Sequence, residues 1–468
     1  MYIIQQIVQR LVRVSFPVKR SGYGKTLAIE VGVRLLLPLA MLATLEQIGG
    51  MGTAQAKVVD AIRAAPLPNS TSLAPPTSRP LELVIDTDGG VDDAAAISWL
   101  LSQTDYPVDI LGFGTVAGNT SVKNAANNVL TLLDTLGRTD IPVAIGAAAP
   151  LKQPLSQTGS LINGPDGFWG AQKPHDLRGL SRNVPTFYRD LAQAHPGATL
   201  LTLGPLTNLA KAWKQYPKAI GRFKQIIVVG GAKNGGNRTP VTEFNIWQDP
   251  EAADELLKAG LPITLVPLDT FEEFTLTDSD LLALPLLGSV AAKLIAKPLQ
   301  TYAIVQTVFG DRTDVPIPDV AAAMYALDSS LGTAQSALVK VVTEPSLARG
   351  QTVIGLTQSE RLPMIASDAE LNRLAQQAIA DPTFNLRAAL DAILAREPYN
   401  AQLVTDIEEQ RMRELFFSAL ASSQKTVSVP DPSFVLSVLA FSAFGATSLF
   451  KCKQKKVKGK RKSAPFHL

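Results

Sequence analysis

Four carboxylates surround a two-glycine turn between Asp86 and Asp93, where the sequence reads DTDGGVDD. An apolar run at 81–85 precedes this turn and a run of small and apolar residues at 94–101 follows it, a pattern of strand, turn and helix. Carboxylates this close repel one another unless a cation lies among them, and calcium takes several oxygen ligands at once. Glycine lets the backbone turn tightly enough to gather the acids. The segment therefore predicts a metal or catalytic site; an acidic turn with a helix-capping Asp, the simpler alternative, needs only one or two acids.

Short apolar runs alternate with helical stretches through the middle of the chain. The predicted strands are 81–85, 108–113, 142–145, 199–203, 225–229 and 263–266, and the predicted helices include 122–136, an extended 209–213 and 250–259. The last of these has clear boundaries, with Asp249 as N-cap, Pro250 in the first turn and Gly260 just past the end. The alternation predicts an α/β fold, a mostly parallel sheet with helices on both faces, in a single catalytic domain.

Polar, turn-forming segments follow four of the predicted strands. They are the acidic turn at 86–93, the segments 115–119 and 204–208, and the pair Gly230-Gly231. In parallel sheets, ligands bind beyond the carboxyl ends of the strands. We therefore expect these four segments to converge on one site.

Charge is distributed unevenly along the chain. Of 44 Lys and Arg and 41 Asp and Glu, residues 1–56 hold six basic and two acidic residues, and residues 451–468 hold eight basic residues and no acid. The body, 57–450, therefore has 30 basic and 39 acidic residues, which argues against nucleic-acid binding through phosphates. Cys452 is the only cysteine, so neither an intrachain disulfide nor a cysteine-based zinc site is possible.

The first 56 residues have the order of a secretory signal peptide. A basic stretch is followed by an apolar run at 35–45 and by the small-residue sequence Ala54-Gln55-Ala56. An amphipathic arm of the folded domain is the alternative. We predict export to the periplasm or cell surface of a bacterium, with cleavage after Ala56, and an extended linker over 57–80, which is rich in Pro, Ser, Ala and Thr.

Residues 430–468 have the pattern of a sorting or membrane-anchor segment. The sequence Pro430-Asp431-Pro432 precedes an uncharged apolar run at 434–450, and a basic block follows. A helix over that run spans roughly 25 Å, a short membrane segment, and the basic block is expected to stay cytoplasmic. The arrangement resembles the PEP-CTERM tail that an exosortase-like sorting enzyme reads, with Asp in place of Glu; a buried core helix is the alternative.

Several motifs, taken in order, resemble the inosine-uridine preferring nucleoside hydrolase family over about 81–375. The family opens with Asp-x-Asp-Pro-Gly-x-Asp-Asp after its first strand, and this chain matches it at 86–93 with Gly89 in place of Pro. The other matching segments are 115–119, 137–143, 204–208, 237–245, 249–253 and, weakly, 349–352. The resemblance implies a nucleoside hydrolase fold with a Rossmann-like core over 81–380.

The resemblance implies a calcium site at the acidic turn. Its ligands would be the carboxylates of Asp88, Asp93 and Asp319 and the main-chain carbonyl of Leu203. Calcium lowers the pKa of a bound water and orients it toward C1′ of a ribose. Asp88 would take the proton of that water.

The resemblance also implies a ribose beside the metal. The residues assigned to the sugar are Asp92, Asn119, Asn237, Glu243 and Asn245. Breaking an N-glycosidic bond develops positive charge on the sugar, which carboxylates and amide oxygens, here that of Asn245, stabilise. The implied reaction is the calcium-dependent hydrolysis of ribonucleosides to free base and ribose.

The groups that would help the base to leave depart from the family pattern. Many relatives have His before the late Asp and a His-Gly pair in an earlier loop, where this chain has Pro318 and Asn163. The three histidines, His175, His195 and His467, lie outside the matched motifs.

Four aromatic residues are the remaining candidates for contact with the base. Tyr302 would act as an acid from a helix, and Phe168, Trp169 and Trp247 would stack on the base. Core packing is the alternative for the three stacking rings.

Two other functions stay open at this point. One is a nucleoside-binding surface protein on a catalytically impaired hydrolase scaffold, suggested by Pro318 and Asn163. The other is an Asp-nucleophile phosphatase, because 86–89 superficially fits an Asp-x-Asp loop. Residues 381–429 lie beyond the resemblance and predict a helical extension with helices at 386–394 and 407–421, and a homo-oligomer is compatible with the sequence.

Overall fold

The computed structural model describes residues 80–104, 106–155, 158–310 and 314–422, all within one compact unit. The predicted signal peptide, nearly all of the predicted linker and the tail predicted for 430–468 lie outside these residues. Within the described ranges, no helix combines the length and the apolar character needed to cross a membrane.

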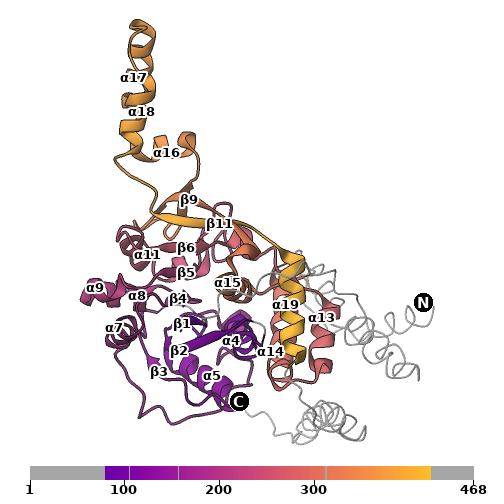
Figure 1. Ribbon diagram of the computed structural model, residues 1–468. Coiled ribbons are helices and arrows are strands. Elements are labelled where there is room, and N and C mark those ends of the chain that lie inside the picture. Colours follow the sequence, from indigo (N-terminus) through magenta and orange to yellow (C-terminus); the bar gives the residue numbers. More distant parts are fainter. Residues whose placement is uncertain (1–79, 105, 156–157, 311–313, 423–468) are drawn as a thin grey trace, which may run out of the picture. The chain divides into compact units, whose positions relative to one another are not determined.

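A nine-stranded sheet forms the centre of the described residues (Figure 1). Its strands are β1 (Leu81–Thr87), β2 (Val108–Thr115), β3 (Val143–Ile145), β4 (Thr199–Thr202), β5 (Gln225–Val229), β6 (Ile263–Val266), β9 (Gly332–Val341), β10 (Thr352–Gly355) and β11 (Ala401–Ile407). They are arranged in the order β10-β9-β11-β6-β5-β4-β1-β2-β3. A separate antiparallel pair consists of β7 (Thr275–Leu276) and β8 (Val315–Pro316).

The six strands expected from the sequence form a parallel block, β3-β2-β1-β4-β5-β6. The chain adds β2 and β3 on one side of β1 and then returns to add β4, β5 and β6 on the other side. This is the doubly wound order, in which ligands bind where the strand order reverses, here between β1 and β4. The prediction of a mostly parallel α/β sheet is confirmed.

Helices cover both faces of the sheet (Figure 1). On one face, α7 (Val184–Ala194), α8 (Thr207–Gln215), α9 (Pro217–Ile220) and α11 (Pro250–Leu257) share an apolar core with Val84 of β1. On the other face, Leu83 and Ile85 pack with α4 (Val91–Leu101), α5 (Val122–Thr135), α12 (Leu268–Phe271), α14 (Val290–Gly310), α15 (Pro318–Leu327) and α19 (Glu409–Ser422). Because side chains alternate along a strand, an apolar run such as 83–85 serves both cores at once.

The shorter helices lie in the connections. They are α6 (Ser160–Asn163), α10 (Phe244–Gln248), α13 (Asp278–Ala283), η1 (Leu284–Leu287), η2 (Ser329–Leu331), α16 (Gln358–Ile365), α17 (Asp368–Ala380) and α18 (Leu386–Leu394).

The helix boundaries follow the capping residues of the sequence. At α11 the Asp249 carboxylate accepts a hydrogen bond from Ala252 N–H at 3.1 Å, and Pro250 occupies the first turn. Gly260, just beyond the end, has φ +70°, which glycine adopts without strain. The predicted start of this helix is confirmed, and its end, Leu257, lies two residues before the predicted one.

The prediction of a helical extension over 381–429 is wrong in part. α18 is present, but Ala401–Ile407 form β11, which pairs parallel with β6 and antiparallel with β9. The helix predicted from Ile407 begins at Glu409 instead. Ala401, Leu403, Val404 and Ile407 are buried, so this segment supplies the sheet with apolar side chains on both faces.

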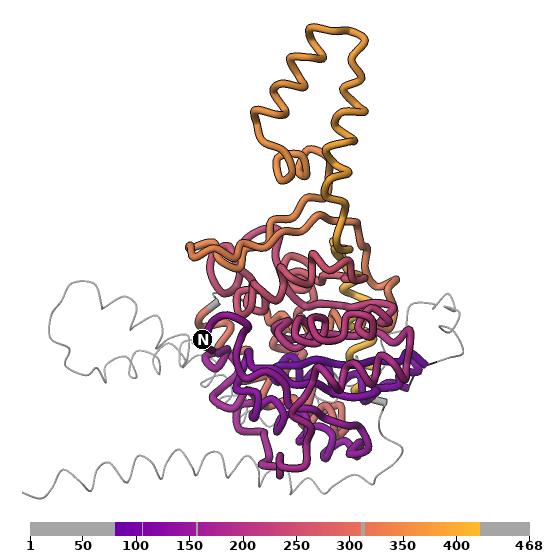
Figure 2. The backbone as a smooth tube through the Cα atoms, turned by 90° about the vertical axis from the view of Figure 1, so that its left-hand side faces the viewer, coloured from indigo at the N-terminus to yellow at the C-terminus, as the bar shows by residue number. Residues whose placement is uncertain are grey.

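The helices between β10 and β11 form a protruding hairpin. Figures 1 and 2 show α17 and α18 running side by side away from the sheet, and α17 has no buried residue. α16, at the base of the hairpin, begins with a capping box in which Thr357 and Glu360 satisfy each other's main-chain N–H groups.

Because β11 lies between β6 and β9, removing it exposes unpaired strand edges inside the sheet. We expect a chain that ends at Arg396 to show no cooperative thermal unfolding by circular dichroism. A chain that ends at Ser422 should melt within about 3 °C of the full-length protein. A cooperative transition in the shorter chain would contradict this account of the sheet.

Candidate active site

The acidic turn lies where the strand order reverses, beyond the carboxyl ends of β1 and β4. Leu203 N–H donates to Asp86 O at 2.8 Å and Val116 N–H donates to Thr87 O at 3.0 Å, which joins the segments leaving β1, β2 and β4. The side chain of Asn245 connects the ends of β4 and β5. The expected convergence of four strand ends is therefore confirmed.

Among the described residues, three buried carboxylates lie close enough together to hold a metal ion. Asp92, Asp93 and Asp319 each place an oxygen within 4.8 Å of the other two. The first two lie in the first turn of α4, and Asp319 lies in the first turn of α15, which packs against α4. Pro318 occupies the first position of α15, a favoured place for proline, and so sets where Asp319 begins the helix.

The fourth acid, Asp88, lies against this group. Burial and the charge of Asp93 raise the pKa of Asp88 well above its ordinary value. Burial and the charges of Asp92, Asp93 and Asp88 do the same to the pKa of Asp319. Burial, followed by the charge of Asp93, raises the pKa of Asp92 to about 7. Without a cation, these neighbouring buried carboxylates cannot all be ionised at the same time.

These residues fit a divalent cation. The donors are all oxygens, which suit hard ions such as magnesium and calcium. Asp92 Oδ1 is buried and has no hydrogen-bond partner among the described residues, although buried polar atoms are nearly always paired. A cation among these carboxylates would satisfy that oxygen and relieve the repulsion.

The turn is folded around the carboxylate of Asp93. Its Oδ1 accepts hydrogen bonds from the Thr87 hydroxyl and from Asp88 N–H, and its Oδ2 accepts Gly90 N–H at 2.9 Å. Gly89 has φ +71°, and a Cβ there would lie 2.6 Å from Ala125 Cα. Proline, which the family has at this position, cannot adopt that φ, so the turn here is specific to glycine.

Asn119 binds the Asp88 carboxylate, although the sequence assigned it to the sugar. Its main-chain N–H donates to Asp88 Oδ2 at 2.7 Å, and its Nδ2 donates to Asp88 Oδ1 at 3.0 Å and to Asp93 Oδ2 at 3.4 Å. A side chain at Gly118 would collide with the same carboxylate. The amide donors of Asn119, assigned to the sugar from the sequence, are therefore directed to two acids.

Asn245, on α10, presents one oxygen. Both hydrogens of its amide are used, by Leu203 O at 2.8 Å and Val229 O at 3.0 Å. Its Oδ1 is therefore the atom left to meet a ligand, and it can only accept a hydrogen bond or face positive charge. Leu203 O keeps a second lone pair for another partner.

Glu243 is largely committed to structure. Its carboxylate caps α10 by accepting the N–H groups of Asn245 at 2.8 Å and Ile246 at 3.0 Å, and it also accepts Gly231 N–H at 3.1 Å. Burial raises its pKa to about 7. Its oxygens keep lone pairs for a hydroxyl group, as a carboxylate accepts up to about four hydrogen bonds.

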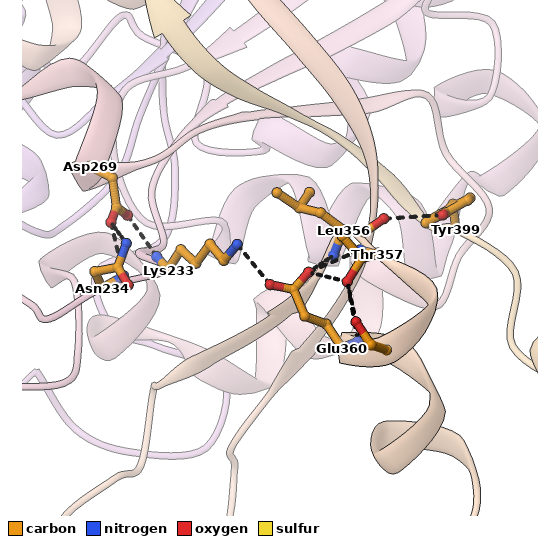
Figure 3. Close-up of polar contacts among 8 residues, drawn as sticks. Lys233, Asn234, Asp269, Leu356, Thr357, Glu360 and Tyr399 are labelled. Atoms are coloured by element: carbon orange, nitrogen blue, oxygen red, sulfur yellow. Dashed lines mark hydrogen bonds and ion pairs between the residues drawn. The ribbon is translucent and has the colours of Figure 1, made fainter.

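The loop that carries Asn237 is anchored at its base (Figure 3). Asp269 accepts Lys233 N–H at 2.6 Å and Asn234 N–H at 2.9 Å, and Lys233 Nζ lies 3.0 Å from Glu360 of α16. Asn237 is exposed, and its Oδ1 accepts Phe244 N–H at 2.9 Å. The loop is therefore fixed to α12 and α16 and leaves the Asn237 amide hydrogens free to reach a ligand.

Tyr302, the predicted acid, faces the acidic group from α14. Its ring is buried, and burial together with the charges of Asp92 and Asp319 raises its pKa well above the ordinary value. Gln306, one turn later, donates to the Tyr302 hydroxyl at 3.1 Å. The phenol is thus protonated at neutral pH, with its own hydrogen free to donate.

The three aromatic rings proposed to stack on a base are placed differently. Phe168 is fully buried in the apolar core, so stacking by this ring is excluded. The Trp169 indole N–H donates to Ile162 O at 2.9 Å. The Arg238 guanidinium lies 4.2 Å from the centre of the Trp247 ring and covers one of its faces.

The two histidines that the structure describes, His175 and His195, lie away from the acidic turn. His195 pairs with Glu82 at 3.1 Å, at the start of β1 and so at the opposite end of that strand from the turn. His175 Nε2 lies 3.4 Å from the Thr131 hydroxyl of α5. His467 falls outside the described residues.

A second network behind the turn was not assigned from the sequence. Asn208 Nδ2 donates to Asp86 Oδ2 at 2.8 Å and to Thr115 O at 2.9 Å, and its Oδ1 accepts Ala147 N–H at 2.8 Å. The Tyr188 hydroxyl donates to the same Asp86 oxygen. This network ties together the ends of β1, β2 and β3. The motif at 204–208 signalled Asn208, whereas Tyr188 on α7 had no signal in the sequence.

Known proteins are similar to this chain in sequence and in fold. The pyrimidine-specific ribonucleoside hydrolase RihA of Shewanella woodyi is 33% identical over 294 residues, which cover 62% of this chain and 93% of the relative. The non-specific ribonucleoside hydrolase RihC of Salmonella paratyphi A is 34% identical over 278 residues, 59% of this chain and 88% of the relative. The solved plant nucleoside hydrolase PpNRh1 is similar with a TM-score of 0.62 and 26% identity, covering 74% of this chain and 100% of that chain.

The profile of the inosine-uridine preferring nucleoside hydrolase family matches residues 83–414. The match extends past the limit of about 375 inferred from the motifs and includes β11, in agreement with the place of that strand in the sheet. The chain therefore belongs to the inosine-uridine preferring nucleoside hydrolase family, a family of metal-dependent enzymes, and is a hydrolase of N-glycosyl compounds.

Proposed function

We propose that this protein is a calcium-dependent ribonucleoside hydrolase that releases free base and ribose. The observation that carries the proposal is the buried group Asp88, Asp92, Asp93 and Asp319, set beside the single free oxygen of Asn245 at the switch point of the sheet. The similar proteins named as ribonucleoside hydrolases support the substrate class.

The proposed calcium ligands are Asp88, Asp93 and Asp319 through carboxylates and Leu203 through its main-chain oxygen. Bound calcium would supply a water of lowered pKa next to the sugar. Asp92, whose Oδ1 is buried and has no partner among the described residues, would bind either the ion or a ribose hydroxyl.

Asp88 is the proposed general base. Its two oxygens are held by Asn119, so the carboxylate cannot rotate freely. A base must lie within hydrogen-bond reach of the proton it takes, and a fixed carboxylate meets this condition without reorganisation during the reaction.

The proposed role of Asn245 is to face the positive charge that develops on the sugar. Because its amide hydrogens are bound to Leu203 O and Val229 O, the oxygen cannot exchange places with the nitrogen. A fixed dipole of this orientation stabilises an oxocarbenium-like transition state. Asp92, Asn237 and Glu243 would bind the ribose hydroxyls.

The assay that tests the proposal is a panel of purine and pyrimidine ribonucleosides with their 2′-deoxy analogues, measured for released ribose with and without a chelator. We expect calcium-dependent turnover of ribonucleosides. Deoxy analogues should be poor substrates, because a missing hydroxyl leaves buried polar groups unpaired at a cost of about 1–3 kcal/mol each. Binding of nucleosides without any released ribose would instead favour the impaired binding protein.

Asp93 shapes the turn and is a proposed calcium ligand, so its replacement should abolish both calcium binding and turnover. In Asp93→Ala we expect the calcium response to disappear in isothermal titration calorimetry, together with turnover. Asp140, an exposed acid paired with Arg138 away from the site, provides the matched control, and Asp140→Ala should retain both. Full activity in Asp93→Ala would rule out the metal assignment.

The raised pKa values predict how stability changes with pH in the absence of metal. Burial raises the pKa of Asp92 and Glu243 to about 7, so both carboxyls hold protons in the folded state at pH values where an unfolded chain has lost them. Their stabilisation of the fold is complete below about pH 4 and is lost as the pH rises through about 7. The raised pKa values of Asp88 and Asp319 act in the same direction. In chelator, the melting temperature should fall between about pH 5.5 and pH 8. Calcium should reduce that fall, because it favours the ionised carboxylates. An equal fall with saturating calcium would contradict the prediction.

The Tyr302 hydroxyl is the proposed donor to the departing base. Tyr302→Phe should lower kcat for natural nucleosides by about 10²-fold or more, while hydrolysis of 4-nitrophenyl β-D-riboside, whose leaving group departs without a proton, should change little. Tyr216→Phe serves as the control, because that residue lies beside α8 and α9, away from the acids. Equal losses on both substrates in Tyr302→Phe would exclude the role.

A further inference from the structure

Asn163, which occupies the position where many relatives have histidine, is fully engaged in hydrogen bonds. The residue ends α6 and is 4% exposed. Its Oδ1 accepts Val91 N–H at 2.9 Å, and its Nδ2 donates to Asn119 Oδ1 at 2.9 Å and to Gly159 O at 3.3 Å. Both of its amide hydrogens are therefore used, and none is left for a leaving base.

These bonds form a continuous path to the proposed general base. Val91 N–H donates to Asn163, Asn163 donates to Asn119, and Asn119 donates twice to Asp88. Every donor in the path points toward the carboxylate, and hydrogen bonds arranged in this way strengthen one another. The path starts at the first residue of α4, so it also relates Asp88 to the helix that carries Asp92 and Asp93.

Two glycines hold the carboxamide pair in place. A Cβ at Gly90 would collide with Asn119 Nδ2 and lie 3.0 Å from Asn163 Oδ1. A Cβ at Gly159 would collide with Asn119 Oδ1 and lie 3.1 Å from Asn163 Nδ2. The side chains of Asn119 and Asn163 thus pack directly against the main chain of these two glycines, and this close packing fixes their orientation.

We propose that Asn163 is a positioning residue, which orients the Asp88 carboxylate through Asn119 and does not donate to the leaving base. The inference rests on the proposed function, in which Asp88 is the general base. A carboxamide can accept one hydrogen bond and donate two at this position, whereas a neutral imidazole has one donor and one acceptor. Asn163 therefore makes three hydrogen bonds in this loop that a neutral histidine could not all make.

The test compares Asn163→Asp with Asn163→Ala. The Asn163→Asp side chain can still accept Val91 N–H but can no longer donate to Asn119 or Gly159. This variant therefore tests the contact with Asn119 while the contact with α4 is kept. We expect kcat to fall by about 10- to 100-fold in both variants, since small displacements of catalytic groups have effects of this size, with KM changed less than about threefold. Calcium affinity from calorimetry should stay within about threefold of wild type, a readout independent of turnover.

Three comparisons separate positioning from other roles. The loss of kcat should be equal for a ribonucleoside and for 4-nitrophenyl β-D-riboside, since Asp88 serves both; a loss confined to the ribonucleoside would assign Asn163 to the leaving base. Asn163→Ala should add no further loss to Asn119→Ala. Asn124, which contacts Pro165 O in the same loop region but not Asn119, gives the control Asn124→Asp, which should keep wild-type kcat.

The outcomes distinguish the inference from the proposed function. If the wild-type protein releases no ribose from either substrate in calcium, the proposed function fails and this inference falls with it. If the wild type is active and Asn163→Asp retains full kcat, only the positioning role is overturned. Melting temperatures identify a variant that fails to fold, and in that case the milder Asn163→Ser takes its place, with the same expected pattern.

Discussion

The repulsion among four buried carboxylates is the constraint on which the rest of the site depends. Asp88, Asp92 and Asp93 come from one turn and Asp319 from a distant helix, and the fold brings them together. Within the described residues, the hydrogen-bond donors to Asp88 and Asp93 are hydroxyl, amide and main-chain N–H groups, not basic side chains. Such a group persists only if protons or a cation neutralise part of the charge. The amide donors of Asn119 hold Asp88 and Asp93, and side chains at Gly90 or Gly159 would collide with Asn119.

The parallel sheet and its acidic turn could be predicted because their signals are local. The strands 225–229 and 263–266 are mostly apolar runs with the bounds that the structure has, and Asp249, Pro250 and Gly260 flank one helix. Strand order then places the polar segments at a common edge, so the existence of the site follows from sequence and topology together.

The roles of individual amides could not be predicted, because they depend on which atoms lie within about 3 Å after packing. Asn119, Asn163 and Asn245 have equivalent side chains, yet one holds two acids, one holds another amide and one offers a bare oxygen. The strand β11 escaped prediction for a related reason. Its seven residues carry no family motif, and a short apolar segment becomes a strand only when partners, here β6 and β9, lie on both sides of it.

The position of β11 has a consequence for how the protein is made. β11 lies near the C-terminal end of the described chain. In the sheet it is placed between β6, the last strand of the parallel block, and β9, with which it pairs antiparallel. Its contacts with β6 and β9 span long stretches of sequence, and contacts of high sequence separation form slowly. During synthesis the doubly wound half can emerge and collapse early and β9 can pair with β10, but this pair cannot join β6 until residues 401–407 have left the ribosome. The mature sheet is therefore completed by almost the last structured segment to be translated among the residues described.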